Sequence, residues 1–145
     1  MRLTIELVPK TAWFNNLRSY LSKSEWDKVR KKCYAEAGYK CEICGGKGHK
    51  HPVECHEVWD FEDGKITLKG LIALCPSCHE VKHIGLASLR GRGHIALKHF
   101  MKVNNIPQHV AEKYVEEAFA LYRERSKRQE WELDVSYLKD YLGNT

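Results

Sequence analysis

The sequence predicts a small α+β domain built around a metal site. Three observations lead to this fold class: two Cys-x-x-Cys pairs, an intervening segment patterned like a β-hairpin, and apolar residues at helical spacing. The 145 residues, 43% of them hydrophobic, can bury one core. We expect a strand and helix within residues 1–40 to pack on a zinc core at 41–86, and residues 87–145 to add helices.

The first 40 residues predict one strand and one helix. Residues 3–8 indicate a short strand. The helix is expected to begin after Ser24 as N-cap, with Asp27 at its third position, and to stop at Gly38. Cys33 lies on the apolar face of this helix, so we expect it in the core rather than on a metal.

The middle of the chain predicts a β-hairpin followed by a short helix. Residues 52–59 and 66–74 indicate the two strands, joined by a turn at 61–64. The first strand carries Cys55 and His56, and the second leads into the second cysteine pair.

The short helix is expected to begin at Pro76, because proline is tolerated in the first helical turn. His79 and His83 are four residues apart and therefore share one face of this helix. Farther along, residues 91–93 indicate a loop, residues 95–101 a helix and residues 107–130 a longer helix. The expected apolar stripe of the long helix comprises Val110, Tyr114, Ala118 and Leu121.

Four cysteines predict a structural zinc. Each Cys-x-x-Cys turn presents two sulfurs one ligand span apart, and two such turns suit one tetrahedral Zn²⁺. The predicted ligands are Cys41, Cys44, Cys75 and Cys78. Close pairs of this kind are typical of metal binding in a reducing compartment, so we expect a cytoplasmic protein. Residues 1–8 are too short and polar for a signal peptide or a membrane span.

The charge distribution favours a polyanionic partner. The net charge is +5, with 11 basic and 5 acidic side chains in residues 1–50, and 4 basic and no acidic ones in residues 85–110. Residues 51–84 carry 3 basic and 6 acidic side chains. This order fits a nucleic-acid surface around a cation-holding centre, and ordinary surface charge is the alternative. The candidate phosphate contacts are Arg90, Arg92, Lys98 and Lys102.

The order of cysteine pair, hairpin, cysteine pair and helix resembles the treble-clef zinc finger. With His56 on the first hairpin arm and His79 on the helix, it resembles the HNH (ββα-metal) endonucleases. The resemblance covers about residues 26–86, and the run LCPSCHEVKH at 74–83 is its most specific part. It implies a metal-dependent endonuclease that hydrolyses phosphodiester bonds, with DNA rather than RNA expected on family grounds.

The resemblance also implies roles for individual residues. His56 would be the general base, a task suited to a group that titrates near neutral pH. His79 would ligate a second divalent metal, either Mg²⁺, Mn²⁺, Ni²⁺ or Zn²⁺, with Cys55 or His83 as a further ligand. This metal would act as a Lewis acid on the scissile phosphate.

Two positions depart from the family pattern. Cys55 stands where aspartate or histidine is usual, and a thiolate prefers Zn²⁺ to Mg²⁺. Gly70 stands where the family has an asparagine that braces the hairpin. Glu54, which shares a strand face with His56, and Glu57, its neighbour, could each supply a brace or a ligand.

These departures leave alternatives open. Cys55, His56, His79 and His83 could close around a second structural zinc, giving a catalytically silent module that binds nucleic acid or a protein partner. A zinc-dependent partner of a larger nuclease or toxin system is a third reading. The other histidines are expected to face solvent or phosphate; they are His49, His51, His94, His99 and His109. No oligomeric state is predicted.

Overall fold

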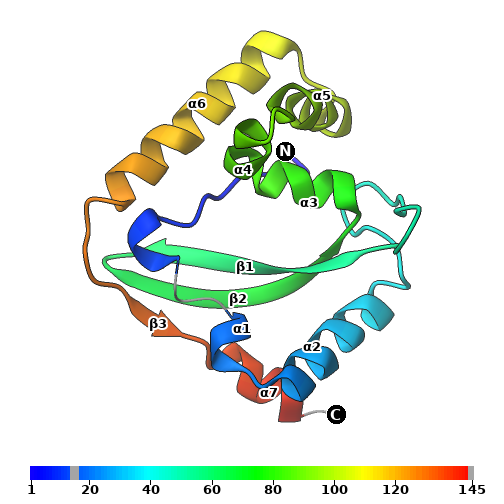
Figure 1. The fold of residues 1–145 in the computed structure, drawn as a ribbon, viewed down its shortest axis with the longest axis vertical. Helices are drawn as coiled ribbons and strands as arrows, with labels where there is room; N and C mark the ends of the chain where they lie inside the picture. Colours follow the sequence, from blue (N-terminus) through cyan, green and yellow to red (C-terminus); the bar gives the residue numbers. More distant parts are fainter. Residues whose placement is uncertain (14–16, 144–145) are drawn as a thin grey trace.

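The computed structural model describes residues 1–13 and 17–143, and the fold is α+β as predicted (Figure 1). Its elements in chain order are η1 (Lys10–Ala12), α1 (Leu17–Tyr20), α2 (Lys23–Glu36), β1 (Glu54–Glu62), β2 (Lys65–Leu74), α3 (Pro76–Lys82), α4 (Ile84–Leu89), α5 (Gly93–Asn104), α6 (Gln108–Arg125), β3 (Glu132–Asp134) and α7 (Tyr137–Gly143). The hairpin β1–β2 crosses the middle of the molecule, with α3 to α6 on one side and α1, α2 and α7 on the other (Figure 1).

The sheet has three strands in the order β1-β2-β3. β1 and β2 pair antiparallel through a turn at Asp63 and Gly64, whose φ angles of 45° and 78° are those of a type I′ hairpin turn. The turn is shorter than the predicted 61–64 segment, because β1 continues through Glu62, and β2 begins at Lys65, one residue earlier than predicted. A register shift lies between Val58 and Trp59, and the unpredicted β3 pairs parallel with β2.

The strand predicted at residues 3–8 is wrong. Leu3 and Ile5 are buried in the core, but side chains take the place of a neighbouring strand. The Leu3 N–H donates to Asn104 Oδ1 at 2.9 Å, and Asn104 Nδ2 donates to the Leu3 carbonyl at 2.9 Å. The Ile5 N–H donates to the Tyr114 hydroxyl at 3.2 Å. The segment is therefore fixed on α5 and α6 without joining the sheet.

Helix α2 begins two residues earlier than predicted. Its N-cap is Ser22 rather than Ser24, because Ser22 and Glu25 form a reciprocal capping box. Gly38, with a φ of 64°, follows the C-terminus as expected. Cys33 is 3% exposed, which confirms its place in the core.

The helices after α3 differ from the prediction in detail. The six-residue α4 was not predicted, and α6 ends at Arg125, short of residue 130. The predicted apolar stripe of α6 is partly wrong, because Val110 and Leu121 are exposed, whereas Ala111 is buried and Phe119 packs against the core. The short side chain of Ala111 lets α6 approach the rest of the core closely.

Two clusters of buried apolar side chains stabilise the hairpin from its two sides. The larger one joins the N-terminal segment, the hairpin and helices α3 to α6, and it includes Leu74, Val81 and Phe100. The smaller one consists of Leu17, Val29, Leu68, Leu138 and Tyr141. Within the described part of the chain, no helix combines the length and apolar character that crossing a membrane requires. The junction of the hairpin with α3, at Leu74 and Cys75, lies within the larger cluster.

Candidate functional site

The four predicted cysteine ligands come together at the start of α3. Cys41 and Cys44 lie in the turn after α2, Cys75 is the N-cap of α3, and Cys78 lies in its first turn. Their sulfur atoms all lie within 4.8 Å of one another, and the Cys44 and Cys75 sulfurs are 3.6 Å apart. This cysteine group could hold a single tetrahedral metal such as Zn²⁺.

Backbone donors and neighbouring thiols prepare the cysteine group for a cation. The Cys44 N–H donates to Cys41 Sγ at 3.5 Å, and the Cys78 N–H donates to Cys75 Sγ at 3.4 Å. A hydrogen bond with the Cys78 thiol lowers the pKa of Cys41 to about 4, whereas burial raises the pKa of Cys75 to about 11. Four thiolates at this distance repel one another, so a bound cation is needed for all to ionise.

His99 is a member of this centre that the sequence did not reveal. Its Nε2 atom lies 3.2 Å from Cys78 Sγ, so the expectation that it faces solvent or phosphate is wrong. The contact arises because α5 packs against α3, and no local spacing encodes it. An imidazole N–H directed at a ligating sulfur is the kind of outer partner that orients metal ligands.

Three histidines form a second group immediately beyond the cysteines. His56 comes from β1, His79 from α3, and His83 is the residue at which α3 ends. One ring nitrogen of each lies within 4.8 Å of the others, and the His79 and His83 Nε2 atoms are 3.2 Å apart. The shared face of His79 and His83 is thus confirmed, and the hairpin brings His56 to it. We call this set the histidine group.

Glu54 orients the histidine group from outside. Its carboxylate accepts a hydrogen bond from His51 Nε2 at 2.8 Å and a second from His79 Nδ1. Partial burial raises the pKa of Glu54, but the hydrogen bonds from His51 and His79 outweigh this effect and lower it. Since His79 Nδ1 donates to Glu54, its Nε2 is left to accept a cation. His51 was expected only to face solvent, and this contact gives it a partner.

The environment of His56 keeps its imidazole neutral. Burial first, and then the nearby His79 and His83, lower the pKa of His56 to about 2. His83 lies at the surface, yet desolvation by its neighbours lowers its pKa to about 4. Among the described residues, no group donates to or accepts from the buried Nδ1 of His56. A divalent cation could coordinate the neutral rings, and a metal-bound water could form a hydrogen bond with the unsatisfied buried nitrogen.

Cys55 and Glu57 do not join the histidine group. Cys55 lies on the other face of β1, buried beside Cys33, and its hydrogen bond with Cys33 together with burial raises its pKa. Adjacent strand residues point to opposite faces, which is why Cys55 and His56 separate. The closed shell of Cys55 with three histidines is therefore wrong. Glu57 belongs to neither group and lines the pocket next to His56.

Gly70 lies opposite Val58, where the hairpin register shifts. A methyl group at this position would meet no atom within 4 Å, so the glycine is not required by crowding. The Glu54 carboxylate, rather than a side chain at position 70, contacts the histidine group.

The predicted phosphate contacts have different surroundings. The Arg92 guanidinium donates two hydrogen bonds to the Glu80 carboxylate, from Nε at 2.6 Å and from Nη2 at 3.2 Å. Arg90, Lys98 and Lys102 are exposed, and Arg90 lines a small recess beside His79 and His83. Arg90 is the member of the basic set that lies next to the histidine group.

The site as a whole consists of a four-cysteine group and a three-histidine group. They meet at the peptide bond between Cys78, which belongs to the first group, and His79, which belongs to the second. The first could hold a metal such as zinc, and the second leaves room for ligands from outside the chain. No family model matches this chain, and neither a curated protein nor a solved structure matches it. The chemistry of the site therefore has to be argued from its own residues.

Proposed function

We propose that this chain is a metal-dependent endonuclease of the HNH type that hydrolyses phosphodiester bonds in nucleic acid, with DNA as the expected substrate. The observation that carries the proposal is the convergence of His56, His79 and His83 next to the cysteine group. Among the described residues no fourth side chain joins them, so a metal held by His79 and His83 would keep open positions beside His56, as catalytic metal sites do.

The arrangement around the histidines supports the finer fold proposal. One cysteine pair precedes the hairpin, the other begins α3, and a histidine from each of β1 and α3 faces the other. This is the order of a treble-clef ββα-metal unit. In this reading the cysteine group holds a structural zinc that fixes α3 against the hairpin.

In the proposed site, His79 and His83 hold the second metal and His56 accepts a proton from the attacking water. When bound, a divalent metal would supply Lewis-acid stabilisation to the scissile phosphate and the leaving oxygen. Glu54 is a positioning residue, because it reaches the site only through His79. The lowered pKa keeps His56 neutral with a free lone pair, but it also makes His56 a weak base, so the experiment below must separate a base from a metal ligand.

Exposed cations near the site support a polyanionic substrate. Arg90 lies in the recess beside His79, and Lys98 and Lys102 extend the positive charge along α5. Contacts of this kind position a phosphate backbone without reading sequence. The Arg92 side chain is paired with Glu80, so we assign it a smaller part in phosphate binding.

The deciding experiment is plasmid nicking by the wild type and by His56→Ala, with Mg²⁺, Mn²⁺, Ni²⁺ and Zn²⁺ in turn. The matched control is His109→Ala, an exposed histidine on α6. We expect nicking that falls at least about a hundredfold in His56→Ala and is unchanged in the control. Retained binding of the second metal by His56→Ala would assign it as the base, whereas loss of that metal would assign it as a ligand.

A catalytically silent zinc module is the second candidate, and Gly70 favours it because it lacks the family's bracing side chain. Such a module would never nick a plasmid with any metal, yet would retain nucleic-acid or protein binding in His56→Ala. Absence of nicking, with both metals bound, would replace the endonuclease proposal with this one.

A further inference from the structure

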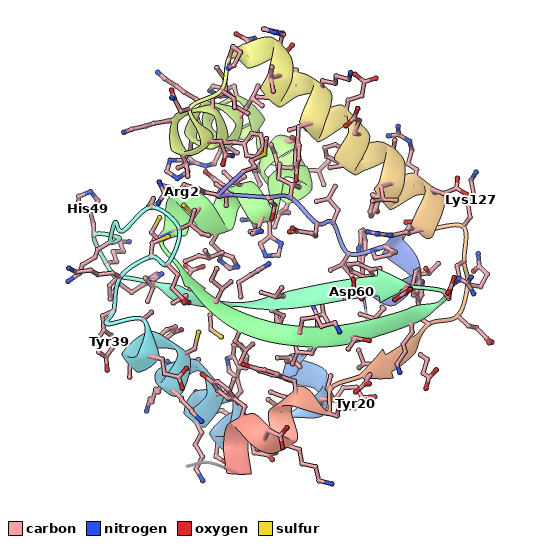
Figure 2. The ribbon with its side chains drawn as sticks, turned by 180° about the vertical axis from the view of Figure 1, so that it is seen from behind. Arg2, Tyr20, Tyr39, His49, Asp60 and Lys127 are labelled. Carbon is pink, nitrogen blue, oxygen red and sulfur yellow. The ribbon has the colours of Figure 1, made fainter. Side chains whose placement is uncertain are left out.

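A large pocket opens directly beside the histidine group. Its volume is about 800 Å³, and His56 and His83 form part of its wall. Most of the remaining wall comes from the N-terminal segment, β1, α4 and α6, and Ile43, Ile72 and Lys82 complete it. Arg2, at the start of the N-terminal segment, lies on the same side of the hairpin as α3 (Figure 2). The endonuclease proposal assigns no role to this pocket.

The wall is rich in aromatic surface. Trp13, Trp59, Phe119 and Tyr122 line it from three parts of the chain, namely the end of η1, β1 and α6. Trp13 is 55% exposed although an exposed tryptophan is costly, which is typical of a surface that binds another molecule. Aromatic rings presented to one space suit a flat partner that offers its face.

The wall also holds two cations near the histidines. Lys82 is only 9% exposed, and its ammonium donates to Glu6 at 2.9 Å and to Thr4 at 3.1 Å. These bonds fix Lys82 between the N-terminal segment and α3, one residue before His83. Arg2 lines the same pocket. Lys82 and Glu6 balance each other's charge within this contact, so Arg2 is the cation of this wall that an anionic ligand would meet.

A second, smaller pocket lies on the other side of His83. Its volume is about 240 Å³, and its wall includes Glu54, His79 and Arg90. His83 and Leu86 line both pockets. The histidine group thus stands between a polar recess that contains an arginine and a chamber lined by aromatic rings.

We propose that the aromatic pocket receives an unstacked nucleobase, so that the substrate is a single-stranded or locally opened nucleic acid. This inference rests on the proposed function only in placing the adjoining phosphate at the histidine group. Bases in a duplex expose their edges, and only an unstacked base offers the face that aromatic side chains contact. An apolar peptide would also cover the rings, but it would make no use of the Arg2 guanidinium in the same wall.

The test measures binding, so it does not depend on cleavage. A fluorescein-labelled single-stranded oligonucleotide and its duplex are titrated with the His79→Ala protein, and the anisotropy is followed. His79 does not itself line the large pocket, so this variant removes a proposed metal ligand without removing a residue of the pocket wall. We expect the single strand to bind at least about tenfold more tightly, because stacking of one base on an aromatic ring corresponds to roughly that factor.

Position 85 supplies a matched pair of variants in the same background. Gly85 lines the pocket, and a methyl group placed there would lie 3.6 Å from Phe119, which is ordinary contact. Gly85→Ala should therefore bind the single strand normally, whereas Gly85→Leu should fill the pocket and weaken binding about tenfold. Trp13→Ala should weaken it similarly, and Trp13→Phe should restore most of it. Circular dichroism checks that each variant is folded.

Equal affinity for single strand and duplex, or normal single-strand binding by folded Gly85→Leu, would overturn the proposal. If Gly85→Leu instead abolishes binding of an apolar dye and leaves the oligonucleotide unaffected, the pocket takes an apolar segment and the proposal is also overturned. Plasmid nicking with a failed binding test would remove this inference alone. Selective single-strand binding without nicking would remove the endonuclease and keep the base pocket.

Discussion

The cysteine group and the histidine group are neighbours in sequence and space, yet they differ in burial and in the number of their members. Three of the four cysteines are buried, and backbone N–H groups donate to their sulfurs. The histidine group has three members, one of them exposed, and two pockets open beside it. A closed shell holds a metal for stability, and an open one offers it to a ligand. The difference teaches that one short helix can serve both purposes.

The strongest way to break this comparison is to remove a cysteine. We expect Cys75→Ser to lose its zinc and most of its cooperative unfolding transition, because structural zinc contributes about 10 kcal/mol, comparable to a whole domain's stability. Zinc content and circular dichroism measure the result. Cys33→Ser is the matched control, since it is equally buried but outside the group, and should keep its zinc. A folded, zinc-bearing Cys75→Ser would contradict the structural role.

Removing the outer support of the histidine group should have a smaller effect that is confined to it. Glu54→Gln keeps the size of the side chain but weakens the hydrogen bond from His79 Nδ1. We expect the affinity for the second metal to fall about 10- to 100-fold while the zinc remains. Isothermal titration with Mn²⁺ or Ni²⁺ measures this. Glu57→Gln is the control, and an equal loss there would show that general charge, not the contact to His79, matters.

The corresponding change on the cysteine side is His99→Ala. Loss of the contact to Cys78 should speed zinc transfer to a chelator about tenfold, without affecting the second metal. A colorimetric chelator assay follows the release. His94→Ala, on the same helix but exposed, should release zinc at the wild-type rate. Unchanged release from His99→Ala would mean that the cysteines need no outer partner.

The smallest expected effect is a dependence of stability on pH. Burial lowers the pKa of His56 from 6.5 to about 2, so the unfolded chain takes up a proton that the folded chain refuses. Stability present above pH 6.5 is therefore lost as the pH falls, by about 1 kcal/mol between pH 7 and 5.5. Urea unfolding of the zinc-bound protein at both pH values measures this. His56→Gln should show a flatter dependence, and an equal slope would place the effect elsewhere.

Local spacing was enough to predict one half of the site. Cys75 and Cys78 take their positions from one helical turn, and His79 and His83 follow from the 3.6-residue period of α3. The hairpin was predicted for the same reason, with a turn at residues 61–64 that contains the observed Asp63-Gly64 turn, because strand alternation and turn chemistry are local.

The remaining features depend on contacts between distant segments, which a single sequence does not encode visibly. His99 reaches Cys78 only because α5 packs on α3, and Asn104 replaces a strand partner for Leu3. Cys55 was misassigned because its neighbour His56 is a site residue, although the strand period sends the two side chains to opposite faces. Applying that period strictly would have placed Cys55 in the core.

The small core cluster bears on how the chain is made. It joins Leu17, Val29 and Leu68 to Leu138 and Tyr141, which the ribosome delivers long after the first three. The larger cluster needs no buried residue beyond Ala111. A nascent chain can therefore assemble its cysteine group and cover the histidine side of the hairpin early, while the α2 side stays uncovered until residues 138–141 emerge. During synthesis, a chaperone that recognises exposed apolar side chains would bind this uncovered side.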